Sequence, residues 1–246
     1  MKRLNGPALL LIVGVVIIAP LMLGLGVWQL ARLNEQRALN AQIRARLALP
    51  PLTLTGAPLT DTAQLEYRRV TVTGVYDFAN EIVLRNRAYQ AAPGVHVLTP
   101  LRLAGEQTAA LVDRGWIPYT QSASEARSVY QQPVGEVTLA GLARRSQVRA
   151  SPLLPADPPL GPDVPRLEAW YWVNLEQIQA QLPYALLPVL VELEASPDRT
   201  KLPVAGYEVD LTDGPHLSYA LQWFAFAAIA VVGPLVYWRQ QRPRLK

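Results

Sequence analysis

The chain has 246 residues, of which half are hydrophobic and only 17% are charged, against roughly 25% charged residues in an average soluble domain. It contains no cysteine, which excludes disulfides, thiolate metal sites and a cysteine nucleophile. Six basic residues and no acid occupy the two ends, and the rest of the chain carries 17 basic and 19 acidic residues. The net charge of +4 therefore gives no basic surface, and no nucleic-acid partner is expected.

Two long apolar stretches predict transmembrane helices at residues 8–30 and 216–238. At about 1.5 Å per residue, each can cross a hydrocarbon core of about 30 Å. Aromatic residues near their ends, such as Trp28 and Trp238, are typical interfacial anchors. A cleaved signal peptide is the alternative for the first stretch, but the apolar run is long and no small-residue cleavage motif follows it. We therefore expect this helix to be retained.

The basic residues at the two ends predict the orientation in the membrane. Residues 1–7 and 239–246 form basic tails without acids, so we expect both tails on the cytoplasmic side. Residues 31–215 then form an extracytoplasmic domain. Four arginines that follow the first helix argue weakly for the opposite orientation: Arg32, Arg37, Arg44 and Arg46.

The region after the first helix begins with good helix formers. Residues 31–49 are expected to extend that helix until two prolines stop it. Residues 67–77 alternate valines with polar residues, which predicts a half-buried strand with a bulge at Gly74. Residues 81–89 are expected to pair with this strand as a hairpin.

Further strands and two short helices complete the predicted domain. A second hairpin is expected from residues 94–103 and 109–119, with later strands at 135–143 and 186–194. Prolines interrupt two of these strands, where edges or bulges are expected: Pro100 and Pro188. A capping box of Ser122 with Glu125 predicts one short helix, and Asn174 is expected to cap a second. Six prolines in residues 151–166 predict an irregular loop.

These elements predict an α+β membrane protein. Two transmembrane helices, one near each end of the chain, flank one antiparallel β-rich extracytoplasmic domain of six or seven strands. The domain is expected to be barrel-like or a sandwich, with short helices.

The standard catalytic motifs are missing from the sequence, so the protein is not expected to be an enzyme. His96 alternates with two valines and is interpreted as a histidine on a strand face. Glu192 and Glu194 share one face of a predicted strand and are expected to face solvent.

Arginines and aromatic residues gather in the two predicted hairpins. Guanidinium groups suit carboxylates, including the propionates of a haem. Four residues are therefore candidate contacts for a propionate or a partner protein: Arg68, Arg69, Arg114 and Trp116. In the alternative, the arginines lie on the solvent face of a sheet and pair with nearby acids, which are Glu66, Glu81 and Asp113.

His216 stands at the start of the second apolar stretch. Residues 213–215 suit a helix start, with Asp213 or Gly214 as the cap, and a neutral imidazole, the metal-ligating form, is expected there. Tyr219 and Trp223 fall on the same helix face by their spacing. His216 is thus a candidate ligand of haem iron, with these two aromatic residues as further cofactor contacts. The alternative is an interfacial histidine bonded to lipid headgroups or a loop carbonyl.

Six segments, in this order, resemble the Surfeit locus protein 1 family: GVWQLARLNEQ, YRRVTVTGVYD, VLRNR, PGVHVLTPL, ALVDRGWIP and HLSYALQWF. They extend from about Gly26 to Phe224, and RGWIP and HLSYALQWF are the most specific. Members of this family are cytochrome c oxidase assembly factors of mitochondrial inner membranes and bacterial plasma membranes. The resemblance implies the same location here, with both termini on the cytoplasmic or matrix side.

The resemblance also implies a function, which is help in building the haem–copper centre of oxidase subunit I by handling or delivering haem a. The implied partners are subunit I, other oxidase assembly or haem a synthesis proteins, and the lipid bilayer. In bacterial members, the histidine that opens the second span is the candidate haem ligand, and His216 occupies that place. The alternative is a cofactor-free membrane scaffold that stabilises an oxidase assembly intermediate.

Two departures from the family pattern affect these expectations. Gly214 and Pro215 stand where the family usually has two asparagines, and Asp113 stands where the VNRGW motif has asparagine. These two differences affect the expected conformation of the loop before the second helix and the expected haem contacts.

Overall fold

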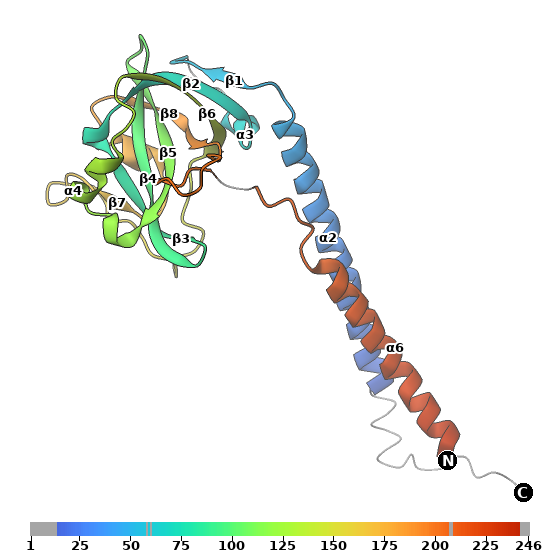
Figure 1. Ribbon diagram of the computed structural model, residues 1–246. Helices are drawn as coiled ribbons and strands as arrows, with labels where there is room; N and C mark the ends of the chain where they lie inside the picture. Colours follow the sequence, from blue (N-terminus) through green and yellow to red (C-terminus); the bar gives the residue numbers. More distant parts are fainter. Residues whose placement is uncertain (1–13, 58, 60, 207–208, 242–246) are drawn as a thin grey trace, which may run out of the picture. The chain divides into compact units, whose positions relative to one another are not determined.

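The computed structural model describes residues 14–57, 59, 61–206 and 209–241 (Figure 1). The chain divides into two compact units, one made of residues 1–44 with 210–246 and the other of residues 45–209. The first residues of the predicted first span, 8–13, lie outside the described residues. So do the basic residues of the tails other than Arg239, namely Lys2, Arg3, Arg242, Arg244 and Lys246.

The first unit consists of two long helices. A π-helical turn, η1 (Gly14–Ile18), leads into α2 (Ala19–Leu47), and α6 (His216–Gln241) follows near the other end of the chain. Two segments, Gly14–Leu47 and His216–Gln240, are long and apolar enough to cross a membrane. The predicted pair of apolar helices is confirmed, and it fits a membrane protein.

The second unit is built on one eight-stranded sheet in the order β1-β2-β6-β8-β5-β4-β3-β7. The strands are β1 (Leu52–Leu54), β2 (Arg69–Tyr76), β3 (Ile82–Tyr89), β4 (Ala92–Leu103), β5 (Thr108–Pro118), β6 (Glu136–Arg145), β7 (Ala169–Trp170) and β8 (Ala185–Leu193). An additional pairing of β2 with β4 closes the ring β2-β6-β8-β5-β4 (Figure 1). The predicted barrel-like domain is therefore confirmed, and β1 and β7 are the strands too short to be predicted.

The barrel closes at Gly74, where β2 meets β4. Gly74 pairs with Leu103 on one side and with Val137 on the other. A Cβ on Gly74 would lie 2.1 Å from the carbonyl oxygen of Arg102, so no larger residue fits without moving the backbone. The predicted bulge at Gly74 is wrong, because the register between β2 and β6 runs unbroken from Arg69 to Val75.

The first predicted hairpin is also wrong. β2 pairs with β1, β6 and β4, whereas β3 pairs with β4 and β7. The turn between β2 and β3 contains η2 (Phe78–Asn80), which carries the chain on to the other end of the sheet. The predicted second hairpin, formed by β4 and β5, is confirmed.

The two strand prolines lie at a register shift in one case and at a change of strand partner in the other. The register of β5 against β8 shifts between Ala109 and Leu111, which is opposite Pro188, as predicted. Pro100 lies between the last β4 residue paired with β3, Leu98, and the first paired with β2, Leu101. A residue without an N–H suits this change of partner.

Short helices and turns connect the strands; they are α3 (Thr62–Leu65), η3 (Tyr119–Gln121), α4 (Ser124–Arg127), η4 (Ser128–Tyr130) and α5 (Leu175–Gln179). Asn174 caps α5 as predicted, because its side chain accepts a hydrogen bond from the Gln177 N–H. The predicted capping box of Ser122 is wrong: Ala123 is the N-cap of α4, and it makes no side-chain cap bond. Residues 151–166 form an irregular loop, as predicted.

The apolar core of the second unit lies on both sides of the sheet. Inside the barrel, all five ring strands contribute buried side chains such as Val72, Leu101 and Val191. On the outer face of β5 and β8, the buried Trp170 and Ile178 bring β7 and α5 against the sheet. β5 and β8 are thus buried on both faces, which leaves their polar residues little access to water.

Candidate functional site

The two long helices pack along a stripe of α6 that begins with His216. Ala220 and Ala227 on this stripe are buried, and the Phe224 ring between them lies against α2 at Gly26. A Cβ on Gly26 would lie 2.4 Å from that ring. Small residues therefore allow close approach of the helices, which is the usual basis of helix association in lipid.

His216 contacts α2 through a hydrogen bond. Its Nδ1 lies 2.9 Å from Oε1 of Gln29, one turn beyond Gly26 along α2. Because an amide oxygen only accepts, Nδ1 is the donor, and in the neutral form of the ring this leaves a lone pair at Nε2. Among the described residues, no side chain or backbone group is hydrogen-bonded to Nε2.

The space beside Nε2 is bounded by Gly214, which has a φ of +67°. A Cβ at this position would lie 3.7 Å from Nε2 and 3.5 Å from Cδ2 of His216. Glycine therefore satisfies the left-handed backbone and also keeps one approach to the imidazole open.

The other two residues predicted for this site lie differently. Tyr219 is 47% exposed, although its neighbour Ala220 is buried. Trp223 is half-buried and makes an edge contact with Phe226, with ring centroids 6.1 Å apart. His216 is the member of the predicted trio that contacts the partner helix through a hydrogen bond.

The segment before α6 is fastened to the same face of α2. The buried Asn40 donates from Nδ2 to the carbonyl oxygens of Leu211 and Thr212, both at 3.0 Å. Arg37 forms an ion pair of 2.8 Å with Asp213, so the carboxylate proposed as a cap for α6 is bound to α2. These contacts hold the start of α6, and therefore His216, in place against α2.

The four candidate residues of the β domain have separate surroundings. Arg114 is buried and committed to Glu81, whose carboxylate it contacts at 3.1 Å together with Arg127 at 3.1 Å. Thr99 donates to the same carboxylate at 2.8 Å. For Arg114, the alternative of pairing with a nearby acid holds, although the pair is buried and not on the solvent face.

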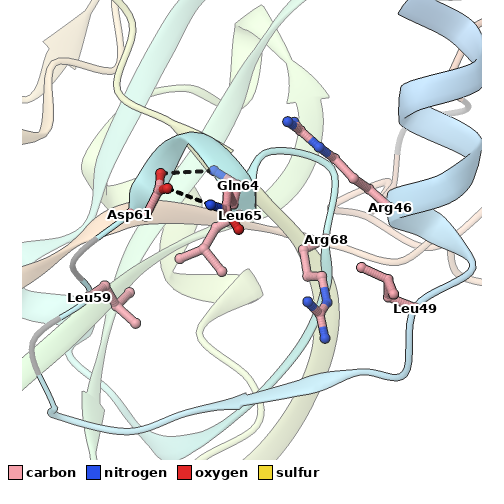
Figure 2. Close-up of a pocket in the computed structure, with 7 residues that line it drawn as sticks. All are labelled: Arg46, Leu49, Leu59, Asp61, Gln64, Leu65 and Arg68. Atoms are coloured by element: carbon pink, nitrogen blue, oxygen red, sulfur yellow. Dashed lines mark hydrogen bonds between the residues drawn. The ribbon is translucent and has the colours of Figure 1, made fainter.

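Arg68 lines an open pocket of about 380 Å³ near the end of α2, shown in Figure 2. Its Nη2 donates to the carbonyl oxygen of Pro50 at 3.1 Å, and its Nε is buried without a partner. Three leucines and Asp61 also line the pocket, and Asp61 is bonded to the first turn of α3. Arg69 points elsewhere, toward Glu194 at 3.8 Å.

Trp116 lines a different cavity of about 460 Å³, together with His96 and Tyr89. The rings of Tyr89 and Trp116 lie 5.6 Å apart. His96 is buried, and its Nδ1 lies 2.9 Å from Oδ2 of Asp113. The histidine predicted on a strand face is therefore half of a buried histidine–carboxylate pair.

A second buried carboxylate, Glu192, lies beside this pair and is not predicted from the sequence. Glu192 is only 8% exposed, next to Asp113 in the parallel register of β5 and β8, so the prediction of a solvent-facing Glu192 is wrong. Burial first, and the charge of Asp113 second, raise the pKa of Glu192 to about 8, although Arg144 at 3.5 Å opposes this shift. The signal that would have revealed it is the apolar run around Glu192, which is buried on both faces.

None of these groups forms a metal cage of its own. Among the described residues, there is no cluster of three or more histidine, aspartate or glutamate side chains that could hold a metal ion.

Comparison with known proteins covers most of the chain. Residues 16–228 match the SURF1 family. A SURF1-like protein of Monosiga brevicollis is 30% identical over 221 residues, covering 85% of this chain and 80% of the relative. Surfeit locus protein 1 of Mus musculus is 27% identical and that of Homo sapiens 26%; each match covers 83% of this chain, and 68% and 70% of the relative, respectively.

Proposed function

Because the chain belongs to the SURF1 family, we propose that it is an assembly factor for a haem–copper cytochrome c oxidase and that it handles haem a on its way to subunit I. The observation that supports haem handling is His216, whose Nδ1 is held by Gln29 while Nε2 has no hydrogen-bond partner among the described residues. The protein binds and passes on this cargo without catalysing a reaction. Its partners are subunit I, other assembly or haem a synthesis proteins, and the bilayer.

The residues around His216 fit a haem. A porphyrin supplies four nitrogen donors to its iron and needs an axial ligand, which a neutral imidazole with a free Nε2 can provide. Gly214 leaves space beside this nitrogen, and the exposed Tyr219 lies one turn along α6. Separately, in the β domain, Arg68 is the arginine of the candidate set that has no carboxylate partner among the described residues, which suits a carboxylate of a ligand or of a partner protein.

If the protein binds haem through His216, the His216→Ala variant should lose bound haem. Protein purified in detergent from cells that make haem a should show a Soret band. His216→Ala should lower the bound haem by at least about tenfold, because the loss of a residue that only supports a metal ligand already lowers metal affinity by about tenfold or more. The variant should remain folded, since it loses a half-buried side chain at a helix end, worth about 1–2 kcal/mol. His216→Met should retain part of the binding through its thioether.

Ser218→Ala is the matched control, because Ser218 lies on the same turn and, among the described residues, its hydroxyl bonds only the Pro215 carbonyl oxygen. If His216→Ala carries as much haem as the parent with the same Soret maximum, the ligand assignment is wrong. If the parent carries no haem but copurifies with subunit I, the protein is the cofactor-free scaffold instead.

We place both termini on the cytoplasmic or matrix side of a bacterial plasma membrane or mitochondrial inner membrane, with the β domain on the other side. The basic ends of the sequence support this orientation. Reporter fusions at Leu47, Pro155 and Lys246 test it. Alkaline phosphatase, active only outside the cytoplasm, should work at the first two positions and not at the third. Cytoplasmic signal from a Pro155 fusion would reverse the orientation.

A further inference from the structure

The partner of His216 on α2 is Gln29. Gln29 is half-buried, and its Oε1 lies 2.9 Å from Nδ1 of His216. The two residues are 187 positions apart in the chain, so the contact exists only when α2 and α6 are packed together. The close approach of Gly26 and Phe224, one turn along, fixes the distance between the helices at this level.

The chemistry of this contact is directional. A glutamine oxygen accepts a hydrogen bond, and of the two neutral forms of the ring it therefore favours the one with the proton on Nδ1. In metal sites, such an outer partner orients the ring, fixes which nitrogen is free and makes that nitrogen more basic. No other hydrogen bond to the imidazole is formed by the described residues, so Gln29 alone performs this selection.

We propose that Gln29 is a positioning residue that holds the imidazole of His216 with Nε2 ready to bind the iron of the cargo haem. This inference rests on the proposed haem handling. Its consequence is that the iron ligand is complete only when the two helices are packed. A separated α6 would carry a freely rotating histidine, with both neutral ring forms populated.

The test compares Gln29→Leu and Gln29→Glu in the full chain, with Gln222→Leu as the matched control. Leucine keeps the helix and the bulk but removes the acceptor, whereas glutamate keeps the acceptor. Gln222 is an exposed glutamine of α6. Gln29→Leu should weaken haem binding by about 10–100-fold. Gln29→Glu should bind haem nearly as the parent does, with a shifted visible spectrum because the imidazole becomes more basic.

A second measurement does not depend on haem. The chain has only two histidines, so nitrogen-15 histidine spectra of the detergent-solubilised protein can be assigned with His216→Ala. In the parent, His216 should carry its proton on Nδ1 alone, and in Gln29→Leu the proton should be distributed over both nitrogens. Gln222→Leu should leave the spectrum unchanged.

Haem binding and the nitrogen spectra together distinguish a failure of the proposed function from a failure of the proposed role of Gln29. A parent protein that takes up no haem overturns the proposed function, and the nitrogen spectra then decide the pairing by themselves. If the parent and His216→Ala behave as proposed while Gln29→Leu binds haem with parental affinity and keeps its proton on Nδ1, the positioning role of Gln29 is wrong. Adding Gln29→Leu to His216→Ala should change haem binding no further, because both act through one nitrogen.

Discussion

Replacing Glu81 by leucine should lower the stability of the β domain by about 3–5 kcal/mol, because it leaves two buried arginines without their shared carboxylate. The Arg114 and Arg127 side chains are 5% and 4% exposed, and both contact Glu81 at 3.1 Å. In a marginally stable protein this is a large share of the total. The melting temperature, followed by tryptophan fluorescence in detergent, should fall on the order of 10 °C.

The loss should begin locally. The guanidinium group of Arg114 also donates to the carbonyl oxygens of Tyr130 and Gln132, and that of Arg127 donates to the carbonyl oxygen of Ser122. The cluster of Glu81, Arg114 and Arg127 therefore holds residues 119–132 against the barrel. Trypsin should therefore cut after Arg127 in Glu81→Leu and not in the parent.

Two variants keep this prediction specific. Glu125→Gln, on the exposed side of α4, removes an acid from the same segment and should change neither melting nor cleavage. Combining Glu81→Leu with Arg127→Leu should cost less than the sum of the two, because one uncompensated charge is removed. A Glu81→Leu protein that melts like the parent would show that the arginines find water, and the cluster would then contribute little.

Replacing Glu192 by glutamine should stabilise the domain at pH 8 and leave it nearly unchanged at pH 5. Burial and Asp113 raise the pKa of Glu192 from 4.5 to about 8, with a smaller contribution from Glu66, while Arg144 and Arg87 oppose the shift. Between these two pH values, the folded protein holds a proton that the unfolded chain has lost. The stability of the parent must therefore fall as pH rises through this window.

Glutamine mimics the protonated carboxyl at every pH, so its advantage grows across the same window. The gain at pH 8 should be on the order of 2–4 kcal/mol, less than the full shift implies because Arg144 can follow the ionised carboxylate. Glu194→Gln is the matched control, since Glu194 lies two residues further along and is half exposed. The prediction is wrong if the melting temperatures of the parent and Glu192→Gln run parallel from pH 5 to pH 8.

Local sequence patterns predict the helices and strands of this fold better than they predict which strands pair. Valine alternation located β2, and the capping side chain of Asn174 located α5, because both signals reside in neighbouring residues. The pairing of β2 with β6 could not be found in this way, since the two strands lie about one quarter of the chain apart. The prediction of a bulge at Gly74 is wrong because the sequence does not show that β4 also pairs at this glycine.

In the candidate site, too, local features could be predicted and long-range contacts could not. His216 could be singled out because it stands at a helix start, which is a local feature. Its bond to Gln29 depends on how two distant helices pack. The prediction for Glu192 is wrong because alternation predicts one solvent-exposed face, whereas β8 is covered on both faces over most of its length.

The place of β8 in the ring also determines when the domain can be completed during synthesis. β8 lies between β5 and β6, although both are made well before it. Until Leu193 has been added, those two strands have unpaired edges, which are open to wrong partners and to other nascent chains. Closure therefore comes late in translation, shortly before α6 is made, and it depends on β8 more than on β1 or β7 at the ends of the sheet.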